Sequence, residues 1–251
     1  MERLILNLRN MIKEIINLED DVRSIKFDMT DTLNHVSKMF SIRQFSLLRS
    51  IDIMQGDENI ILISRSMFEG AVYIKAFYNQ YKKKGFSNLA NDWRNFAIVL
   101  DRRRLELEAN VNITSYELEF LESERSINIA KEFGNKTKWT KNKTIKDIST
   151  TAKLNEKYDE YYSPMSDYCH WGTRSFGDRY RITDDHMNIE EQNNNIRVYT
   201  ELNSLCIGIT SLFIVLDIFC DRSNNVNLQN KILEIKNKIE NIDGIVAKYL
   251  T

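Results

Sequence analysis

The stretch Asn59–Lys84 reads NIILISRSMFEGAVYIKAFYNQYKKK and predicts a buried helix over about 58–84. Its first half is apolar on almost every side, which is typical of a helix buried in a protein core. Arg65 and Glu69 interrupt this apolar surface at positions i and i+4, so their side chains share one face of the helix. The stretch therefore predicts a helical core with a charged pair inside it.

This charged pair has two interpretations, which the sequence leaves open. An exposed i,i+4 ion pair contributes only about 0.3–0.5 kcal/mol, whereas removing one partner of a buried pair costs about 3–5 kcal/mol. In the first interpretation, Arg65 and Glu69 form a structural ion pair that fixes the register of the helix. In the second, Arg65 reaches into a functional site and Glu69 orients its guanidinium group.

The composition favours a helical protein without a strong overall charge. The 251 residues include only 8 glycines and 1 proline, which argues against a loop-rich or all-β protein. The net charge of −1 gives no global field that would recruit nucleic acid or membrane, so a polyanion site must be a local patch. Three cysteines without a CxxC motif are typical of a reduced, cytoplasmic protein. We expect no disulfide scaffold, no metal and no cofactor.

The most apolar run, Leu202–Cys220, is almost long enough to span a bilayer. Polar residues interrupt it, and an aspartate such as Asp217 in a membrane helix costs about 3 kcal/mol. The N-terminus begins with charges inside an amphipathic pattern and does not resemble a signal peptide. We therefore expect a buried core helix and no membrane partner.

Both ends of the chain carry strict heptad patterns, which predict long terminal helices over 2–27 and 226–249. The apolar positions are spaced 4-3-4-3-4-3 in each: Leu4, Leu8, Met11, Ile15, Leu18, Val22 and Ile25, then Leu228, Ile232, Ile235, Ile239, Ile242, Val246 and Tyr249. Such seams pack on another helix. We expect the terminal helices to pack together, either within one chain or across a homodimer.

The segments between these seams complete a single all-α domain over 1–251, a bundle of about seven to nine helices with its core at about 30–222. Thr114-x-x-Glu117 and Thr144-x-x-Asp147 are capping boxes, and Gly85 and Gly134 are helix stops. The basic loop 135–143, NKTKWTKNK, surrounds Trp139. Its indole either anchors the loop on the core or stacks on a nucleobase, and the sequence favours the anchor.

The stretch Tyr158–Gly172, YDEYYSPMSDYCHWG, is the second candidate site. Ser163-Pro164 predicts a helix start, because serine is a good N-cap and proline suits the first helical position. Gly172 would end that helix after about two turns. Ser166 and His170 are then four residues apart on one face, so a hydroxyl and an imidazole can reach each other. We expect this segment to meet the helix that carries Arg65.

The following segment, TRSFGDRYRI, mixes arginines with aromatic residues. Arg174, Arg179 and Arg181 alternate with aromatic rings in a pattern that suits a phosphate backbone and unstacked bases. A short loop that packs its rings and solvates its arginines explains the pattern equally well. We therefore consider the three arginines substrate-binding candidates. Asp184-Asp185-His186 lacks a second ligand at metal-binding spacing, so we expect no metal there.

Two resemblances follow from these motifs. The R-S-M-F-E run at Arg65–Glu69, with a later tryptophan and the Y-x-x-Y-Y…S-x-x-x-H segment, resembles a bacterial all-helical family of unknown function, over roughly residues 30–220. A looser likeness is to the HEPN superfamily, whose signature is R-x(4–6)-H followed by glycine. The matching segment here is M-S-D-Y-C-H-W-G, in which His170 fits the family histidine and Ser166 occupies the place of the arginine.

The HEPN likeness implies a metal-independent endoribonuclease, or a degenerate relative, that acts in defence or toxin–antitoxin systems. His170 would be the general acid or base, Arg65 or Arg174 would neutralise the charge of the transition state, and Ser166 would fix the imidazole ring. Such sites commonly form across a homodimer, and RNA would be the partner. The alternative is a non-catalytic helical module that binds a partner protein or nucleic acid, in which the four polar residues merely hold two helices in register.

Overall fold

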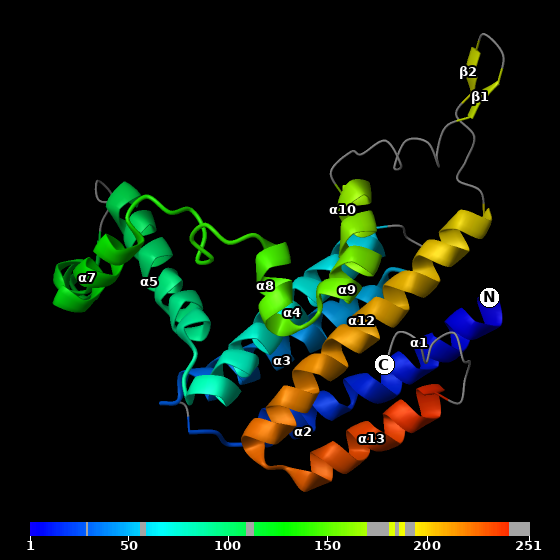
Figure 1. The fold of residues 1–251 in the computed structure, drawn as a ribbon, viewed down its shortest axis with the longest axis horizontal. Helices are drawn as coiled ribbons and strands as arrows, with labels where there is room; N and C mark the ends of the chain where they lie inside the picture. Colours follow the sequence, from blue (N-terminus) through cyan, green and yellow to red (C-terminus); the bar gives the residue numbers. More distant parts are fainter. Residues whose placement is uncertain are drawn as a thin grey trace.

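The computed structural model describes residues 1–28, 30–55, 59–108, 113–169, 181–183, 186–188 and 194–240. Two long helices form its centre: α4 (Ile60–Lys84) and α12 (Asn194–Ser223), which pack along each other (Figure 1). The helix α3 (Thr32–Ile53) packs against both. The described residues are almost entirely helical, so the prediction of an all-α fold is confirmed.

Two apolar clusters build the core on either side of these helices. In the first, α12 contributes residues such as Leu205, Leu212 and Phe219 to a cluster shared with α3 and the terminal helices. In the second, α4 contributes Phe68, Val72 and Phe77 to a cluster shared with the residues after 144. Both α4 and α12 are buried, as predicted, because they carry apolar residues on nearly every side.

The helix α12 also meets the length and composition expected of a membrane-spanning helix. Its segment Arg197–Ser223 is long and apolar enough to cross a bilayer, but 83% of the most apolar window is buried inside the protein. A soluble core helix passes the same test of length and composition. The burial is what the sequence predicted for this run.

The N-terminal region forms two helices, α1 (Glu2–Ile16) and α2 (Leu18–Ser24), where a single helix over 2–27 was expected. The break falls at Asn17, a residue whose side chain competes for backbone hydrogen bonds and disfavours helix interiors. The C-terminal helix α13 (Val226–Glu240) is described only as far as 240, so the rest of the predicted helix lies outside the described residues.

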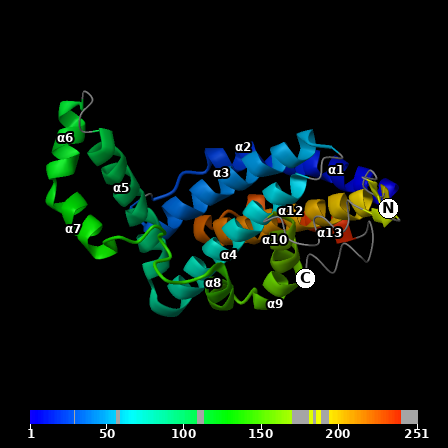
Figure 2. The ribbon, with the colours of Figure 1, turned by 90° about the horizontal axis from the view of Figure 1, so that it is seen from above.

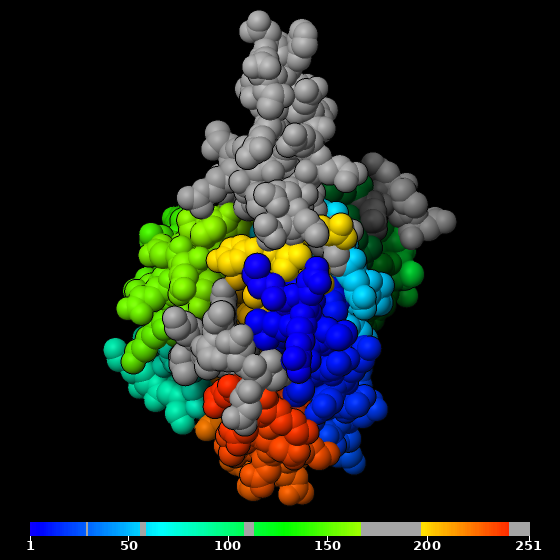
Figure 3. Space-filling view, turned by 90° about the vertical axis from the view of Figure 1, so that its right-hand side faces the viewer, coloured from blue at the N-terminus to red at the C-terminus, as the bar shows by residue number. Residues whose placement is uncertain are grey.

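Within one chain, α13 packs beside α1 and α2 (Figure 3). Ile232, Ile235 and Ile239 lie in the same apolar cluster as Leu8, Ile12 and other residues of α1. Ion pairs join the same helices at the surface: Lys238 Nζ is 3.1 Å from Glu14 Oε2, and Lys231 Nζ is 2.7 Å from Asp21 Oδ2. The described part of the C-terminal seam is therefore covered by the chain's own N-terminal helices.

Three helices form an arm that projects from one end of the bundle: α5 (Asn88–Glu108), α6 (Ser115–Glu122) and α7 (Glu124–Phe133) (Figure 2). The arm has a small apolar core of its own, which is formed by Phe96, Val99 and Phe133. Arg102 and Arg103 brace the arm, because Arg102 donates to Leu121 O at 2.6 Å and Arg103 donates to Gly134 O at 2.8 Å.

Most of the predicted helix boundaries are confirmed. Thr114 and Thr144 form capping boxes, Gly85 ends α4 in the left-handed conformation at φ 76°, and Gly134 ends α7. The sequence did not predict that Ser123 would end α6 and cap α7, with its Oγ accepting from Ser126 N–H at 3.3 Å.

The segment from α8 (Ile145–Ala152) to α10 (Ser163–Cys169) differs from the prediction at its centre. After α9 (Asn155–Lys157), a π-helical turn over Tyr158–Tyr162 runs directly into α10, so Ser163 has helical backbone and is not an N-cap. A proline inside a helix loses one backbone hydrogen bond and clashes with the carbonyl four residues earlier. The wider turn just before Pro164 accommodates it. Gly172 lies outside the described residues.

Two short strands, β1 (Arg181–Thr183) and β2 (His186–Asn188), pair in antiparallel register with Ile182 opposite Met187. No convincing strand was predicted there. Because the predicted N-terminal helix is divided at Asn17, and α6 and α7 are separate helices that meet at Ser123, the described residues contain more helical segments than the expected seven to nine.

Candidate functional site

The site centres on three side chains that join α4 to the π turn. Arg65 and Glu69 project from α4, and Tyr162 reaches them from the last position of the π turn. Arg65 Nη2 donates to Tyr162 Oη at 2.7 Å, and Tyr162 Oη donates to Glu69 Oε1 at 2.5 Å. Arg65 Nη2 also lies 3.5 Å from Glu69 Oε1. A guanidinium, a phenol and a carboxylate thus form one closed cluster.

Aromatic rings extend this cluster along the surface. Tyr158 stacks on Tyr162 with ring centroids 4.9 Å apart and planes 24° apart. The Arg65 guanidinium lies over the Tyr162 ring, 4.8 Å from its centroid, and Lys146 Nζ lies 5.9 Å from the centroid of Tyr158. Cations near both rings are favourable because aromatic faces are negative. The result is a pair of stacked rings with one cation near each, and Lys146 also pairs with Asp159 at 3.1 Å.

Burial and charge keep the Tyr162 hydroxyl protonated. Its pKa is raised well above the usual value, first because the phenol is buried, and second because it donates to Glu69. The neighbouring Tyr73 has its pKa raised to about 12 by burial and by the Glu69 carboxylate. Arg65 acts in the opposite direction on both groups. At neutral pH, Tyr162 therefore works as a neutral hydrogen-bond bridge, not as a base.

The cluster is neither sealed in the core nor fully exposed. The Arg65 side chain is 18% exposed and the Glu69 side chain is 31% exposed, whereas Tyr162 is buried. Phe68 packs against the Tyr162 ring and closes the inner side. The Arg65 side chain is therefore partly accessible to solvent, while Tyr162 and Glu69 set the orientation of its guanidinium.

Trp139 serves as an anchor, as the sequence favoured. Its indole packs edge-on against Tyr73, with centroids 4.9 Å apart, and against Phe77 at 5.5 Å. The basic loop is thereby held on α4, one to two turns beyond Glu69.

The other predicted site residues stand as follows. Ser166 lies on α10, partly buried, one turn after Tyr162, and α10 packs against α4. His170, Arg174 and Arg179 lie outside the described residues. Arg181 begins β1, and its side chain is not described. The structure thus brings Arg65 and Glu69 together with the segment that contains Ser166, and leaves the histidine and the substrate-binding arginines untested.

Tyr162 is the site residue that sequence reasoning missed. The signal was the Y-x-x-Y-Y run, which places Tyr158 and Tyr162 four residues apart in a helical segment. We predicted a serine–histidine pair on that segment and gave its tyrosines no role. The spacing alone does not show that Tyr162, and not Ser166, is the group that meets Arg65.

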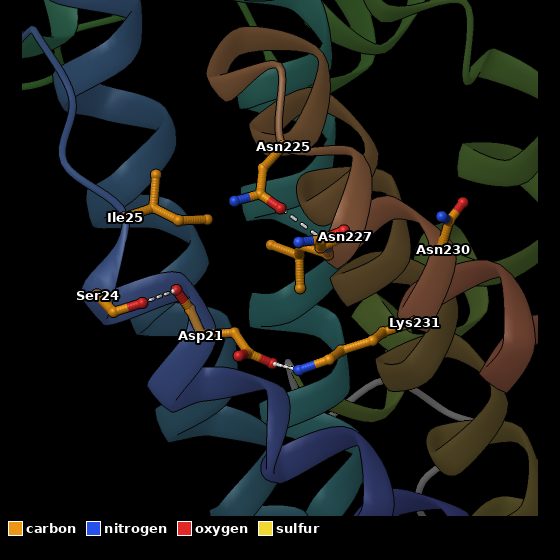
Figure 4. A pocket seen from close by; sticks show the side chains of 8 residues that line it. Asp21, Ser24, Ile25, Asn225, Asn227, Asn230 and Lys231 are labelled. Atoms are coloured by element: carbon orange, nitrogen blue, oxygen red, sulfur yellow. Dashed lines mark hydrogen bonds and ion pairs between the residues drawn. The ribbon is translucent and has the colours of Figure 1, made fainter.

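A pocket of about 410 Å³ lies elsewhere, between α2 and the start of α13 (Figure 4). The Asp21–Lys231 ion pair crosses it, and Asn225 Oδ1 accepts from Leu228 N–H at 2.8 Å as the cap of α13. Asp21 and Lys231 are the two charged residues that line the pocket, and they pair with each other, so the lining carries no net charge. Among the described residues, no group of three or more His, Cys, Asp or Glu side chains is placed to hold a metal ion.

These features define an all-α bundle protein in which the central helix α4 and the π turn carry a partly exposed Arg–Glu–Tyr cluster. The chain belongs to a family of unknown function, DUF5677, whose model matches residues 35–188. The match runs from α3 to β2, so it includes Arg65, Glu69 and Tyr162 and excludes the terminal helices and α12. The predicted membership of a family of unknown function is confirmed. Neither the comparison with curated proteins nor the comparison with solved structures found a match.

Proposed function

We propose that this protein is a metal-independent endoribonuclease of the HEPN-like type, with Arg65 as the residue that stabilises the transition state. The observation that carries the proposal is the placement of Arg65, whose guanidinium is held by Tyr162 and Glu69 and whose side chain is 18% exposed. A fixed cation that requires no reorganisation is the arrangement that stabilises developing negative charge.

The chemistry needs an acid–base group beside this cation. His170 follows Tyr162 by eight residues and Ser166 by four, so it belongs to the segment that Tyr162 ties to α4. An imidazole with a pKa near neutrality can take the proton of a ribose 2′-hydroxyl and return one to the leaving oxygen. Arg65 would neutralise the phosphorane, and Ser166 would orient the imidazole. No step in this scheme requires a metal.

The stacked rings and the cations beside them support RNA as the substrate. Tyr158 stacks on Tyr162 and Lys146 lies near Tyr158, and stacked aromatic surface next to positive charge suits unpaired bases and their phosphates. Arg174, Arg179 and Arg181 follow in the sequence and would continue this surface. In this proposal they bind the substrate and do not take part in bond cleavage.

The test is cleavage of mixed single-stranded RNAs in the presence of EDTA. We expect wild type to cleave, His170→Ala to lose about 10²–10⁴-fold in rate, and Arg65→Lys to lose about 10²–10³-fold because the planar fork is lost. His35→Ala is the matched control, because His35 lies on α3 with Arg94 as its charged neighbour. Cleavage that EDTA abolishes, or equal cleavage by wild type and His170→Ala, would contradict the proposal.

A second candidate is a non-catalytic module that binds RNA or a partner protein. It is favoured by two observations: Ser166 stands where the HEPN signature has arginine, and Glu69 already balances the charge of Arg65. In that case the Arg–Glu–Tyr cluster fixes α10 on α4 and does no chemistry. Wild type and His170→Ala would then be equally inert in the cleavage assay, and both would bind RNA or the partner with the same affinity.

A further inference from the structure

The projecting arm carries apolar residues that the bundle does not cover. Trp93, Leu100 and Leu107 recur at intervals of seven residues, which places them on one side of α5, and Phe86 precedes the helix. Trp93 packs against Phe40 at the base of the arm. Phe86 and Leu100 are each 51% exposed, and Leu107 is 85% exposed. Spacing of this kind is what a helix uses to pack on another helix.

The tip of the arm is also incompletely packed. The helix α6 has eight residues and none of them is buried. Tyr116 is 79% exposed and Leu118 is 50% exposed. Isolated helices shorter than about 12–15 residues are marginal in water, and most helical stability comes from a packed apolar face. A partner that covers this tip would supply the missing contacts.

Charge is distributed unevenly between the tip and the base. Residues 105–124 contain six glutamates and no lysine or arginine: Glu106, Glu108, Glu117, Glu119, Glu122 and Glu124. Glu119 and Glu122 are exposed and make no ion pair with the described residues. The base is basic, because residues 136–157 contain seven lysines and two acidic residues. Lys138 and Lys143 are exposed there, on the loop that Trp139 anchors.

The basic loop runs along α5 toward the base of the arm. It begins beside Arg103, which donates to Lys136 O at 2.8 Å, and Lys141 pairs with Asp92 near the start of α5. A helix of 21 residues is about 31 Å long, so the later part of the loop lies well away from the tip. Two arms packed in antiparallel orientation place each acidic tip on the basic base of the other copy. The contact is then isologous, because the same surface serves both chains and a two-fold axis closes it.

We propose that two copies of this chain form a homodimer through antiparallel pairing of their arms. The exposed leucines of α5 form the seam, and the acidic tip of each α6 meets the lysines of the partner's loop 135–143. The terminal helices are not the interface in this arrangement, because the described part of α13 already packs on α1 and α2 of its own chain. The proposal does not depend on ribonuclease activity.

The experiment is light scattering coupled to gel filtration of the full chain at low and high salt. We expect wild type to have twice the 29.6 kDa mass of one chain at low salt. Leu107→Glu, and separately the charge reversal Glu119→Lys with Glu122→Lys, should raise the dissociation constant of the dimer at least ~10-fold. Leu233→Glu is the matched control, because Leu233 is 55% exposed but lies on α13. It should leave the mass unchanged.

A complementary reversal distinguishes pairing from misfolding. Lys138→Glu with Lys143→Glu should also give a monomer, and mixing it with the reversed tip variant should restore the dimer mass, because opposite charges face each other again. Circular dichroism of each variant shows whether it is folded. A monomeric wild type, a dimer that Leu107→Glu leaves intact, or folded reversed variants that fail to recombine would overturn the proposal.

Discussion

Tyr162 donates a hydrogen bond to Glu69 at 2.5 Å across a separation of 93 residues, and through it the π turn is fixed to the central helix α4. The same hydroxyl accepts from Arg65 at 2.7 Å. One oxygen thus links the two charged groups that the sequence predicted as a pair. This relationship makes Tyr162 a positioning residue, and removing its hydroxyl tests how far the cluster depends on it.

We predict that Tyr162→Phe destabilises the protein by about 1–3 kcal/mol. The ring still packs on Tyr158 and Phe68, but Arg65 and Glu69 lose the partner between them, and partly buried polar groups without partners are costly. Urea unfolding followed by circular dichroism measures the change. The control is Tyr116→Phe, because Tyr116 is 79% exposed on α6 and should have no measurable effect. Equal stability of wild type and Tyr162→Phe would show that the bridge contributes nothing.

The raised tyrosine pKa values predict a loss of stability at alkaline pH. A phenol whose pKa is higher in the folded state contributes stability that is fully present below its unfolded value of 10.0. For Tyr73 that contribution decreases as the pH rises from about 10 to about 12, and Tyr162 acts in the same direction. In a pH titration followed by tyrosinate absorbance, Tyr73 and Tyr162 should ionise at higher pH than the exposed tyrosines. Their ionisation should coincide with unfolding of the protein. In Tyr162→Phe, one late group should disappear.

The sequence predicted the elements better than it predicted their ends or partners. The apolar pattern of the sequence identified α4 and α12 as buried helices. Helix boundaries were predictable where a cap depends only on neighbouring residues, as it does at Thr114, Thr144, Gly85 and Gly134. The prediction that a helix starts at Ser163 was wrong. The Ser-Pro pair is typical of a helix start, but here the preceding π turn continues directly into α10.

Site prediction reached the correct helix but did not identify Tyr162 as the residue that meets it. Arg65 and Glu69 were identifiable because charges are rare on a buried helix face. Which residue of the later segment meets them depends on the rotation of that segment about its own axis. The π turn changes this rotation, because one extra residue per turn moves every following side chain around the helix. No local pattern in YDEYYSPMSDYCH reports that rotation.

Asp31 should have two separable contributions. Its side chain caps α3, accepting from Leu33 N–H at 2.8 Å and Asn34 N–H at 3.1 Å, and it also pairs with Arg222 at 3.1 Å. We predict that Asp31→Ala costs about 1–2 kcal/mol or more, because the cap and the ion pair are both lost. Asp31→Asn keeps a good cap and loses only the charge, so its urea midpoint should lie between those of Asp31→Ala and wild type. Identical midpoints for the two variants would exclude a contribution from the cap.

The last prediction concerns the close approach of α3 and α4 at Gly70. A Cβ at this position would lie 2.8 Å from Gln44 Nε2, which is buried and donates to Met67 O at 2.8 Å. Alanine raises helix propensity by about 1 kcal/mol over glycine, but here it forces Gln44 away from its acceptor, and overpacking costs about 1–3 kcal/mol.

We therefore expect Gly70→Ala to lower the thermal midpoint in spite of its better propensity. The double variant Gly70→Ala with Gln44→Ala removes the clash. Its thermal midpoint should be higher than the value obtained by adding the shifts of the two single variants, because the effects of substitutions at residues in contact are not additive. Additive effects, or a Gly70→Ala variant more stable than wild type, would show that the side chain of Gln44 moves aside freely.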